Sequence, residues 1–230
     1  QVCNCCGVRV LITGGAGFIG QAVVPELAAK AERVVVLDSL RPDVHGHDGA
    51  SSGERRARLV TLGAELVVGD VRDQRAVAAA LTGIDAVVHL AAKVGLGVGI
   101  ADMDDYVSSN DYATAVLLRC LADAQVPRFV QASSMVVYGE GRYSCREHGA
   151  VRPAARTQDA LCRGRFEPPC PVCGADLMPE LVDEEAPMDP RNTYAATKVS
   201  QEHLASVWAR ETGGSAISLR LHNVYGPGMP

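Results

Sequence analysis

The sequence predicts a doubly wound α/β fold, in which helices cover both faces of a parallel β-sheet. Short runs rich in Val, Ile and Leu alternate along the chain with longer helix-forming segments, and a glycine-rich turn joins the first run to the first helix. Runs that are apolar throughout are typical of parallel strands, because such strands are buried on both faces. Their alternation with helices is the pattern of consecutive strand–helix–strand units.

The alternation assigns each element to a residue range. The strands are expected at Val8–Thr13, Arg33–Asp38, Glu65–Gly69, Ala86–Leu90, Phe129–Ser133 and Ala216–Leu221. The helices are expected at Phe18–Lys30, Asp73–Leu81, Met103–Ala124 and Tyr194–Thr212. The segment Asp43–Arg56 is rich in Gly, Ser and His and is expected to be a surface loop. Residues 139–191 break the alternation, because they are rich in Pro, Arg and Cys and have no clear period.

Length, charge and hydropathy limit the class of protein. With 230 residues the chain can bury a sizeable core, so one large domain is expected over residues 8–230, after a leader of residues 1–7. A net charge of −5 and the lack of a basic run argue against nucleic acid as a partner. No apolar stretch is long enough to cross a membrane and no secretory signal opens the chain, so a cytoplasmic protein is expected. The chain begins with Gln1 and ends at Pro230 within a glycine–proline run, so both ends are candidate cuts.

The turn after the first strand predicts a dinucleotide site. Gly14, Gly17 and Gly20 lie three residues apart, and a helix-forming run follows them. A strand that turns sharply into a helix directs unpaired backbone N–H groups and the positive helix end at one point, which suits a pyrophosphate. We therefore expect the turn, with Phe18 and Ile19 inside it, to contact the cofactor. The alternative is a purely structural glycine turn.

Residues at the ends of later strands extend this predicted cofactor site. Asp38 ends the second strand, where a carboxylate accepts both ribose hydroxyls of adenosine and repels a 2′-phosphate, which favours NAD over NADP. The alternative for Asp38 is a helix-cap or turn aspartate. Asp70 and Val71 are expected beside the adenine ring. The small residues of the segment 90–92, which are Leu90, Ala91 and Ala92, are expected to let the backbone pass close to the cofactor. His89 is expected to be a packed strand-end residue.

Three polar side chains form a predicted catalytic group. Tyr194 and Lys198 lie four residues apart on an expected helix and therefore share one face. An ammonium near a phenol favours the phenolate, so we expect Lys198 to lower the pKa of Tyr194 and to bind the nicotinamide ribose. Ser134 follows a strand at the carboxyl edge of the sheet, where its hydroxyl is expected to bind the reacting oxygen of a substrate. A turn-forming serine pair is the alternative reading of Ser133 and Ser134.

Together these motifs resemble those of the extended short-chain dehydrogenase/reductases, and among them the NAD-dependent sugar-nucleotide epimerase/dehydratases. The resemblance rests on the segments 13–20, 69–73, 89–92, 133–139 and 220–228, on Asp38, and on Tyr194 with Lys198. It implies a Rossmann-type fold, bound NAD, a dTDP- or UDP-linked sugar as substrate and a homodimer. It also implies that Asn110 shapes the active-site backbone and that Asn223 helps to hold the substrate diphosphate. In the family much of the sugar-nucleotide pocket comes from later sequence, so the C-terminal substrate region is expected to be largely absent here.

The same resemblance favours one reaction. Dehydratases and decarboxylases of the family carry acidic residues directly after the catalytic Ser or Thr, whereas Met135 and Val136 occupy those positions here and cannot move protons. Epimerisation at C4, through a transient 4-keto sugar, is therefore expected, and the segment 91–98 with the Cys-bearing insertion looks like dTDP-rhamnose-type 4-epimerases. The alternatives are a dehydratase or net reductase of the same fold, and a non-catalytic NAD-binding or interaction module.

Residues 140–190 form an insertion with a predicted metal site. It contains Cys145-x-x-His148-Gly and Cys170-x-x-Cys173-Gly, two ligand pairs that each precede a glycine as in zinc knuckles. Four ligands suit a tetrahedral, structural zinc, with Cys162 as a possible replacement for His148; the alternative is a disordered loop with reduced thiols. Cys120 is expected to be a buried apolar residue. The remaining cysteines lie in the leader and are expected to have no function: Cys3, Cys5 and Cys6.

Overall fold

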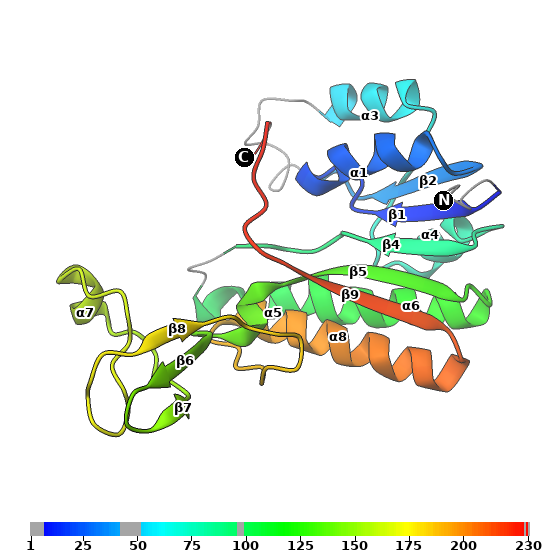
Figure 1. The fold of residues 1–230 in the computed structure, drawn as a ribbon. Coiled ribbons are helices and arrows are strands. Elements are labelled where there is room, and N and C mark those ends of the chain that lie inside the picture. Colours follow the sequence, from blue (N-terminus) through cyan, green and yellow to red (C-terminus); the bar gives the residue numbers. More distant parts are fainter. Residues whose placement is uncertain (1–6, 42–51, 96–98, 228, 230) are drawn as a thin grey trace.

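The computed structural model describes residues 7–41, 52–95, 99–227 and 229, and within them it confirms the predicted parallel α/β sheet. The strands of this sheet are β1 (Arg9–Thr13), β2 (Arg33–Asp38), β3 (Glu65–Val68), β4 (Ala86–His89), β5 (Arg128–Ser134) and β9 (Ser215–Leu221). They lie in the order β3-β2-β1-β4-β5-β9 (Figure 1), and each neighbouring pair is parallel. The carboxyl ends of all these strands therefore meet at one edge.

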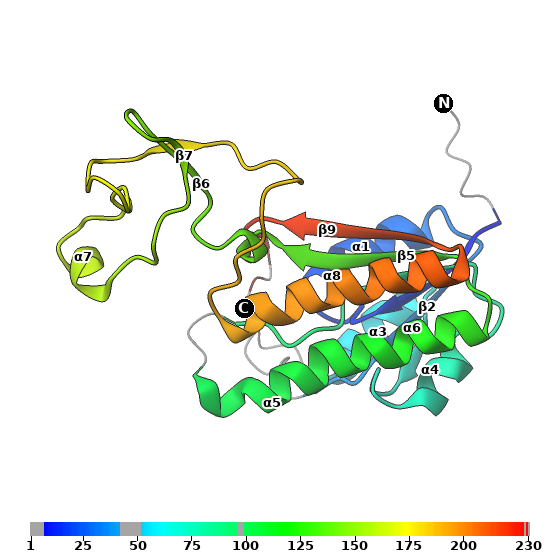
Figure 2. The same cartoon turned by 90° about the horizontal axis from the view of Figure 1, so that it is seen from below.

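Helices pack on the two faces of the sheet, as Figures 1 and 2 show. They are α1 (Phe18–Ala28), α3 (Ser52–Thr61), α4 (Gln74–Ala80), α5 (Met103–Tyr106), α6 (Ala113–Asp123) and α8 (Thr193–Thr212). Short turns of 3-10 helix occur at Ile100–Asp102 and Met135–Tyr138. No helix in the described part of the chain combines the length and the apolar character needed to cross a membrane.

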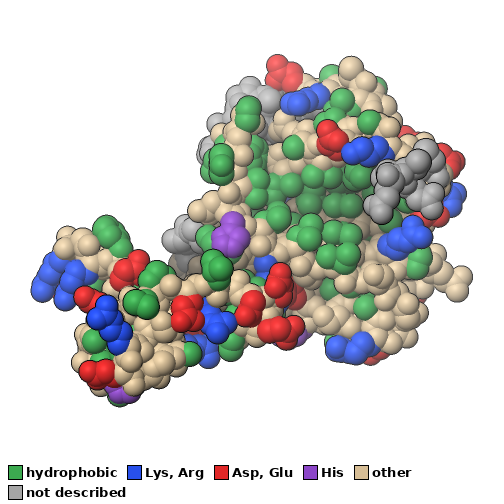
Figure 3. Space-filling model, viewed as in Figure 1, with side chains coloured by type: hydrophobic (Ala, Val, Ile, Leu, Met, Phe, Trp, Pro, Cys, Tyr) green, Lys and Arg blue, Asp and Glu red, His purple; other side chains and the backbone are tan. Residues whose placement is uncertain are grey.

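Alternating side chains of the strands divide the core into two clusters. On one face Leu11 of β1 packs with Trp208 of α8 and with apolar residues of α4 and α6. On the other face Ile12 packs with Val24 of α1 and Leu59 of α3. Neighbouring residues of a strand point to opposite faces, so both clusters need the unbroken apolar runs that the sequence shows. Some apolar side chains of the edge strand β9 stay exposed, among them Ile217. Figure 3 shows a patch of apolar side chains on the face of the molecule that it presents.

Two predicted elements differ from those observed. The predicted loop Asp43–Arg56 is wrong over its last residues, because α3 begins at Ser52; residues 42–51 lie outside the described part. The run Glu-Arg-Arg-Ala-Arg-Leu favours a helix, and Leu59 anchors it in the core. The predicted helix Met103–Ala124 is interrupted by a π-helical segment, Val107–Tyr112.

The insertion folds as a small unit beyond the carboxyl edge of the sheet (Figures 1 and 2). It contains β6 (Arg142–Cys145), β7 (Gly149–Val151) and β8 (Met178–Glu180), which pair in antiparallel order β7-β6-β8, and the short helix α7 (Gln158–Cys162). Strands this short carry no readable period, which is why the sequence indicates no elements there.

Candidate active site and Cys/His centre

A cavity opens where β1, β2 and β4 end, next to the glycine-rich turn. Many of the predicted cofactor residues line it together: Gly14, Gly17, Asp38, Asp70, Val71, Leu90, Ala91 and Ala92. Phe18, Ile19 and Gly20 lie instead in the first turn of α1, directly after the cavity wall. In a parallel sheet this edge is the usual place for a ligand, because the helices that follow the strands begin there.

Close backbone packing explains the glycines at the turn. Gly14 has a φ of +72°, and a Cβ there would lie 2.5 Å from the backbone nitrogen of Ala91. A Cβ on Gly20 would lie 2.4 Å from the carbonyl oxygen of Gly15, so the glycine lets α1 pack against the turn. Gly17 precedes α1 with extended backbone, and no side chain caps the helix. The first N–H groups of α1 are therefore available to an anion.

Asp38 both lines the cavity and organises the turn. Its carboxylate is 5% exposed, accepts a hydrogen bond from the Ala16 amide at 2.9 Å and accepts another from the Leu40 amide at 2.9 Å. The predicted alternative of a turn aspartate is therefore part of its structural role. Because the side chain also faces the cavity, this role is compatible with binding a ribose.

Basic side chains that the sequence reading missed also line the cavity. Arg72 pairs with Asp70 at 2.6 Å and lowers the pKa of that carboxyl by hydrogen bonding. Lys93 forms an ion pair with Asp105, and Arg41 lies 3.6 Å from the same carboxylate. Only Arg72 stood within a motif, the segment 69–73. Nothing in the local sequence distinguishes Arg41 or Lys93 from ordinary surface cations.

Asn110 lies in the π-helical segment and holds the backbone behind the cavity. Its side-chain oxygen accepts a hydrogen bond from the Lys93 amide at 2.7 Å, and its amide nitrogen donates to the Lys93 carbonyl at 3.0 Å. The same nitrogen donates to the Thr197 hydroxyl of α8 at 2.9 Å. Asn110 is fully buried and does not line the cavity. It joins the loop after β4 to the helix that carries Tyr194, and π-helical segments often occur at functional sites.

Ser134 and Tyr194 lie together at the carboxyl edge, at the end of β5 and in the first turn of α8. Burial raises the pKa of Tyr194, while a hydrogen bond with the Ser134 hydroxyl opposes that rise. Lys198 donates to the Ala132 carbonyl at 2.9 Å, and its ammonium lies 5.7 Å from the Tyr194 ring centroid. The prediction that Lys198 lowers the pKa of Tyr194 is wrong for this structure, because the effect of burial prevails.

A buried ion pair supports this group from behind. Glu202 lies two helical turns after Tyr194 and one turn after Lys198, on the same face of α8. Its carboxylate accepts the Ser133 hydroxyl at 2.5 Å and pairs with Arg220 at 2.8 Å. Arg220 also donates to the Tyr138 hydroxyl at 2.6 Å. The sequence could have indicated Glu202 through its four-residue spacing from Lys198, but its partners Ser133 and Arg220 are evident only from the fold.

His89 and Asn223 have different surroundings. Burial lowers the pKa of His89 to about 3, so the imidazole is neutral, and its ring nitrogens contact the hydroxyls of Thr13 at 2.7 Å and Thr114 at 3.0 Å. This confirms the prediction of a packed strand-end residue. Asn223 follows β9 with an exposed side chain.

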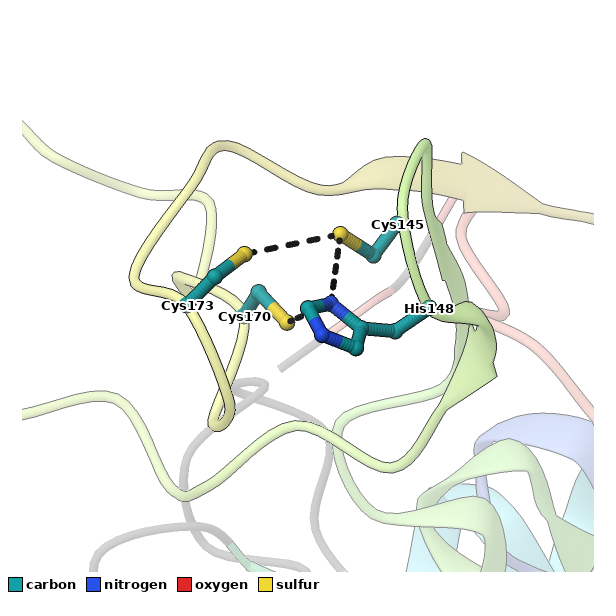
Figure 4. A group of neighbouring side chains, drawn as sticks. All are labelled: Cys145, His148, Cys170 and Cys173. Atoms are coloured by element: carbon teal, nitrogen blue, oxygen red, sulfur yellow. Dashed lines mark hydrogen bonds between the residues drawn. The ribbon is translucent and has the colours of Figure 1, made fainter.

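The predicted metal ligands of the insertion converge. The ligand atoms of Cys145, His148, Cys170 and Cys173 all lie within 4.8 Å of one another (Figure 4). The Cys145 sulfur lies 3.5 Å from the His148 Nδ1 and 3.7 Å from the Cys173 sulfur. Hydrogen bonds from the backbone amides of Glu147 and His148 lower the pKa of the Cys145 thiol.

The geometry distinguishes between the two candidate fourth ligands. Cys162 lies in α7, is exposed and accepts a hydrogen bond from Gln158, whereas His148 joins the group. Gly149 and Gly174, which follow the two ligand pairs, have φ values of +66° and +74°. Glycine adopts this left-handed conformation without strain, and each chain segment can fold back around its ligands there. Cys3, Cys5 and Cys6 lie outside the described residues.

Known proteins share both the sequence and the fold. The model of the "NAD dependent epimerase/dehydratase family" matches residues 10–157 and 171–230, so that only the part of the insertion with α7 falls between the matched ranges. A dTDP-L-rhamnose 4-epimerase of Burkholderia thailandensis is 36% identical over 97% of this chain and 60% of its own length. A dTDP-glucose 4,6-dehydratase of Streptomyces niveus is 29% identical over 96% of this chain and 55% of its own length.

Solved structures of related enzymes have the same fold as this chain. A double mutant of the dTDP-glucose 4,6-dehydratase DesIV from Streptomyces venezuelae, solved with NAD, superposes with a TM-score of 0.71 at 29% identity, over 96% of this chain and 57% of that chain. The UDP-glucose 4-epimerase of Thermus thermophilus, also solved with NAD, gives a TM-score of 0.67 at 28% identity, with the same coverage of both chains. This chain thus spans 55–60% of the length of these relatives. It belongs to the NAD-dependent epimerase/dehydratase family.

Proposed function

We propose that this chain carries the cofactor site and the proton relay of an NAD-dependent nucleotide-sugar epimerase that acts at C4. The observation that carries the proposal is the convergence of Ser134, Tyr194 and Lys198 at the same sheet edge as the glycine-lined cavity. The apolar residues Met135 and Val136 directly after Ser134 favour epimerisation over elimination. The epimerases among the relatives support this reaction, and their dTDP- and UDP-sugars support a nucleotide sugar as substrate.

The residues of the cavity fit NAD. A Cβ at Gly14 would fill space beside Ala91, and the uncapped N-terminus of α1 offers backbone N–H groups to a pyrophosphate. The Asp38 carboxylate suits the adenosine ribose and disfavours a 2′-phosphate. When bound, NAD supplies the acceptor and donor of hydride at the sugar carbon.

The chain's own side chains would handle the proton. Ser134 binds the reacting oxygen of the sugar, and Tyr194 takes the hydroxyl proton during oxidation and returns it during reduction. Burial raises the pKa of the Tyr194 phenol and so favours its protonated form, which is the form that donates in the returning step. Lys198 binds the nicotinamide ribose and supplies positive charge near the phenol.

The test is the conversion of dTDP- and UDP-sugars in the presence of NAD, with products resolved by NMR. Formation of the C4 epimer is the expected result, and Tyr194→Phe should slow it by about 10²–10⁴-fold while NAD affinity is retained. Tyr112→Phe, an exposed tyrosine, is the matched control. A 4-keto-6-deoxy product would establish a dehydratase, and accumulating NADH a net dehydrogenase. Unchanged sugars with NAD bound would establish a non-catalytic module.

We further propose that Cys145, His148, Cys170 and Cys173 bind one structural zinc ion. Three thiols and one imidazole are a donor set that zinc prefers, and four protein ligands leave no position for a substrate. Metal analysis should find about one zinc per chain. Cys173→Ser should lose it, and Cys162→Ser, outside the group, should retain it. Equal zinc contents of the two variants would contradict the proposal.

A further inference from the structure

The insertion leaves and rejoins the sheet domain at the two members of the candidate catalytic pair. Ser134 ends β5, and the outgoing stem (residues 135–141) follows it directly. The return stem (residues 181–192) leads into α8, where Tyr194 occupies the first turn. Contacts that hold the two stems together therefore also influence the positions of the Ser134 and Tyr194 hydroxyls.

The insertion has too small an apolar core to fix itself. Its buried cluster consists of Tyr143, Cys145, Cys170 and Leu177, with Val151 packed against it. Two of these buried residues belong to the Cys/His centre. Units of this size usually need a metal or disulfides for a stable fold, and the described cysteines form no disulfide. The small core therefore leaves the proposed zinc as the main candidate for ordering the insertion.

A continuous path of contacts leads from the centre to the stems. His148 is followed by β7, which pairs with β6 in the register Tyr143↔Val151. Arg152, the next residue, contacts the return stem twice: its guanidinium lies 3.1 Å from the Asp189 carboxylate and donates to the Met188 carbonyl at 3.1 Å. The metal ligand and the stem are thereby joined through one short strand.

The return stem is in turn bound to the outgoing stem. The Asp189 amide donates to the Val137 carbonyl at 2.8 Å. Gly139, with a φ of +65°, lies so close that a Cβ there would be 2.3 Å from the Asp189 carbonyl oxygen. The Asp189 carboxylate also pairs with Arg191 at 2.5 Å, beside Asn192, which caps α8. Asp189 therefore joins the two stems directly, and Arg220 joins them a second time by donating to the Tyr138 hydroxyl and the Glu184 carbonyl.

Polar contacts of Asp189 hold the two stems together next to a groove. A groove of about 490 Å³ lies between the insertion and its stems, lined by residues that include Tyr138, Arg142, Arg152 and Asp189. Charged side chains gather at the same place in Figure 3. An exposed ion pair alone contributes little, but here one carboxylate joins two guanidinium groups while its backbone is held independently.

We propose that metal binding at the Cys/His centre is coupled to the Ser134–Tyr194 pair, because the metal-ordered insertion presses the return stem against the outgoing stem. This inference rests on the proposed zinc site and the proposed catalytic roles. The chain of hydrogen bonds and ion pairs through Arg152 and Asp189 carries the coupling, and Arg152 is its positioning residue. The glycine-rich turn and Asp38 lie outside the path, so NAD binding is independent of the metal.

Amide hydrogen exchange of the intact chain, with zinc and after chelation, tests the coupling without any substrate. Chelation should accelerate exchange at residues 135–140 and 186–195 by about 5- to 150-fold, the usual range of coupling between sites. Exchange in β1 and β2 should not change. If the acceleration stays within residues 142–180, the insertion is independent of the catalytic pair and the proposal is overturned.

Variants separate the metal from the path. Cys173→Ser should reproduce the effect of chelation, whereas Cys162→Ser should not. Arg152→Gln should retain zinc but lose the protection of both stems, and Arg152→Lys, which keeps the charge opposite Asp189, should restore part of it. Protection of the stems in Arg152→Gln equal to that of the wild type would overturn the path.

Catalytic readouts distinguish this proposal from the proposed function. With an active sugar substrate, Arg152→Gln should lower kcat while NAD affinity and zinc content stay at wild-type values. Failure of every sugar would contradict the epimerase, but the exchange experiment would still decide the coupling. Absence of zinc from the purified chain, and failure of added zinc to bind, would overturn both the metal site and the coupling.

Discussion

Lys198 combines nearly complete burial with a charge. Loss of hydration lowers its pKa to about 8, although the nearby carboxylates of Asp111 and Glu202 oppose the shift. Its ammonium donates to the Ala132 carbonyl, which satisfies one of its three donors. A buried amine with a pKa near the working pH is typical of functional sites, where burial is tolerated for the sake of chemistry.

This burial predicts a pH dependence of stability. The folded pKa of about 8 lies below the ordinary value of 10.5, so between these values the unfolded chain binds more protons than the folded chain. The free energy of unfolding contributed by Lys198 should therefore rise with pH across that interval. Urea unfolding of the wild type and Lys198→Met at several pH values measures it, because other titrating groups cancel in the difference. A difference that does not change with pH would contradict the burial.

At the residue scale, local spacing correctly predicted which side chains lie close together. The glycine turn and each of the two Cys/His pairs are recognisable because residues close in sequence are also close in space there. Arg41, Lys93 and Glu202 were missed because their partners come from distant segments. The pKa of Tyr194 was predicted in the wrong direction, since spacing reveals the charge of Lys198 but not the burial around the phenol.

At the level of elements, the turn between β1 and α1 requires glycine at position 14. Gly14 combines a left-handed conformation with close contact to Ala91, while Gly63, which precedes β3, has a similar φ of +77° and open space around its Cα. The two positions therefore separate conformational strain from steric exclusion.

Gly14→Ala and Gly63→Ala form a matched pair of variants. Both should lose about 1 kcal/mol or more through the positive φ, measured by urea unfolding. Only Gly14→Ala should also displace the end of β4 and reduce NAD affinity by more than about tenfold in calorimetric titration. Equal NAD affinities of the two variants would show that the turn does not bind the cofactor.

Elements with continuous apolar runs were predicted well, whereas α3, the π-helical segment and the strands of the insertion were not. The central strands β1, β2, β4 and β5 bury much of their apolar runs, so their existence follows from composition, whereas the edge strands β3 and β9 keep apolar side chains exposed. The helix α3 was missed because the polar residues before it suggested a loop, and the π-helical segment contains Asn110, whose buried partners Lys93 and Thr197 are distant in sequence. The strands of the insertion are three or four residues long, too short to show a period, and the Cys/His residues beside them carry no periodic signal.

For the whole molecule, the sheet domain and the insertion differ in what holds them together. The sheet domain has two large apolar clusters, and the insertion has one small cluster that includes Cys145 and Cys170 of the Cys/His centre. Trp208, the only tryptophan of the chain, lies 6% exposed in a cluster of the sheet domain, with its ring centroid 6.0 Å from that of Phe129. Its fluorescence therefore reports on the sheet domain alone.

Chelation should consequently leave the emission maximum of Trp208 unchanged, even where it removes zinc and opens the insertion. Denaturant should shift the emission to longer wavelength as the ring meets water. Fluorescence spectra before and after chelation, compared with spectra in urea, provide the measurement. A shift on chelation as large as that in urea would mean that the sheet domain needs the metal for its own fold.

The position of the insertion also affects how this fold can diversify. Between β5 and α8 the chain already turns back at the carboxyl edge of the sheet, so added residues there need not cross the sheet or change its strand order. The same connection begins at Ser134 and ends beside Tyr194. A longer loop at this connection therefore adds a unit that joins the sheet domain next to Ser134 and Tyr194, the proposed proton-handling groups. Such a unit changes the surroundings of this pair without altering a residue of the cofactor cavity.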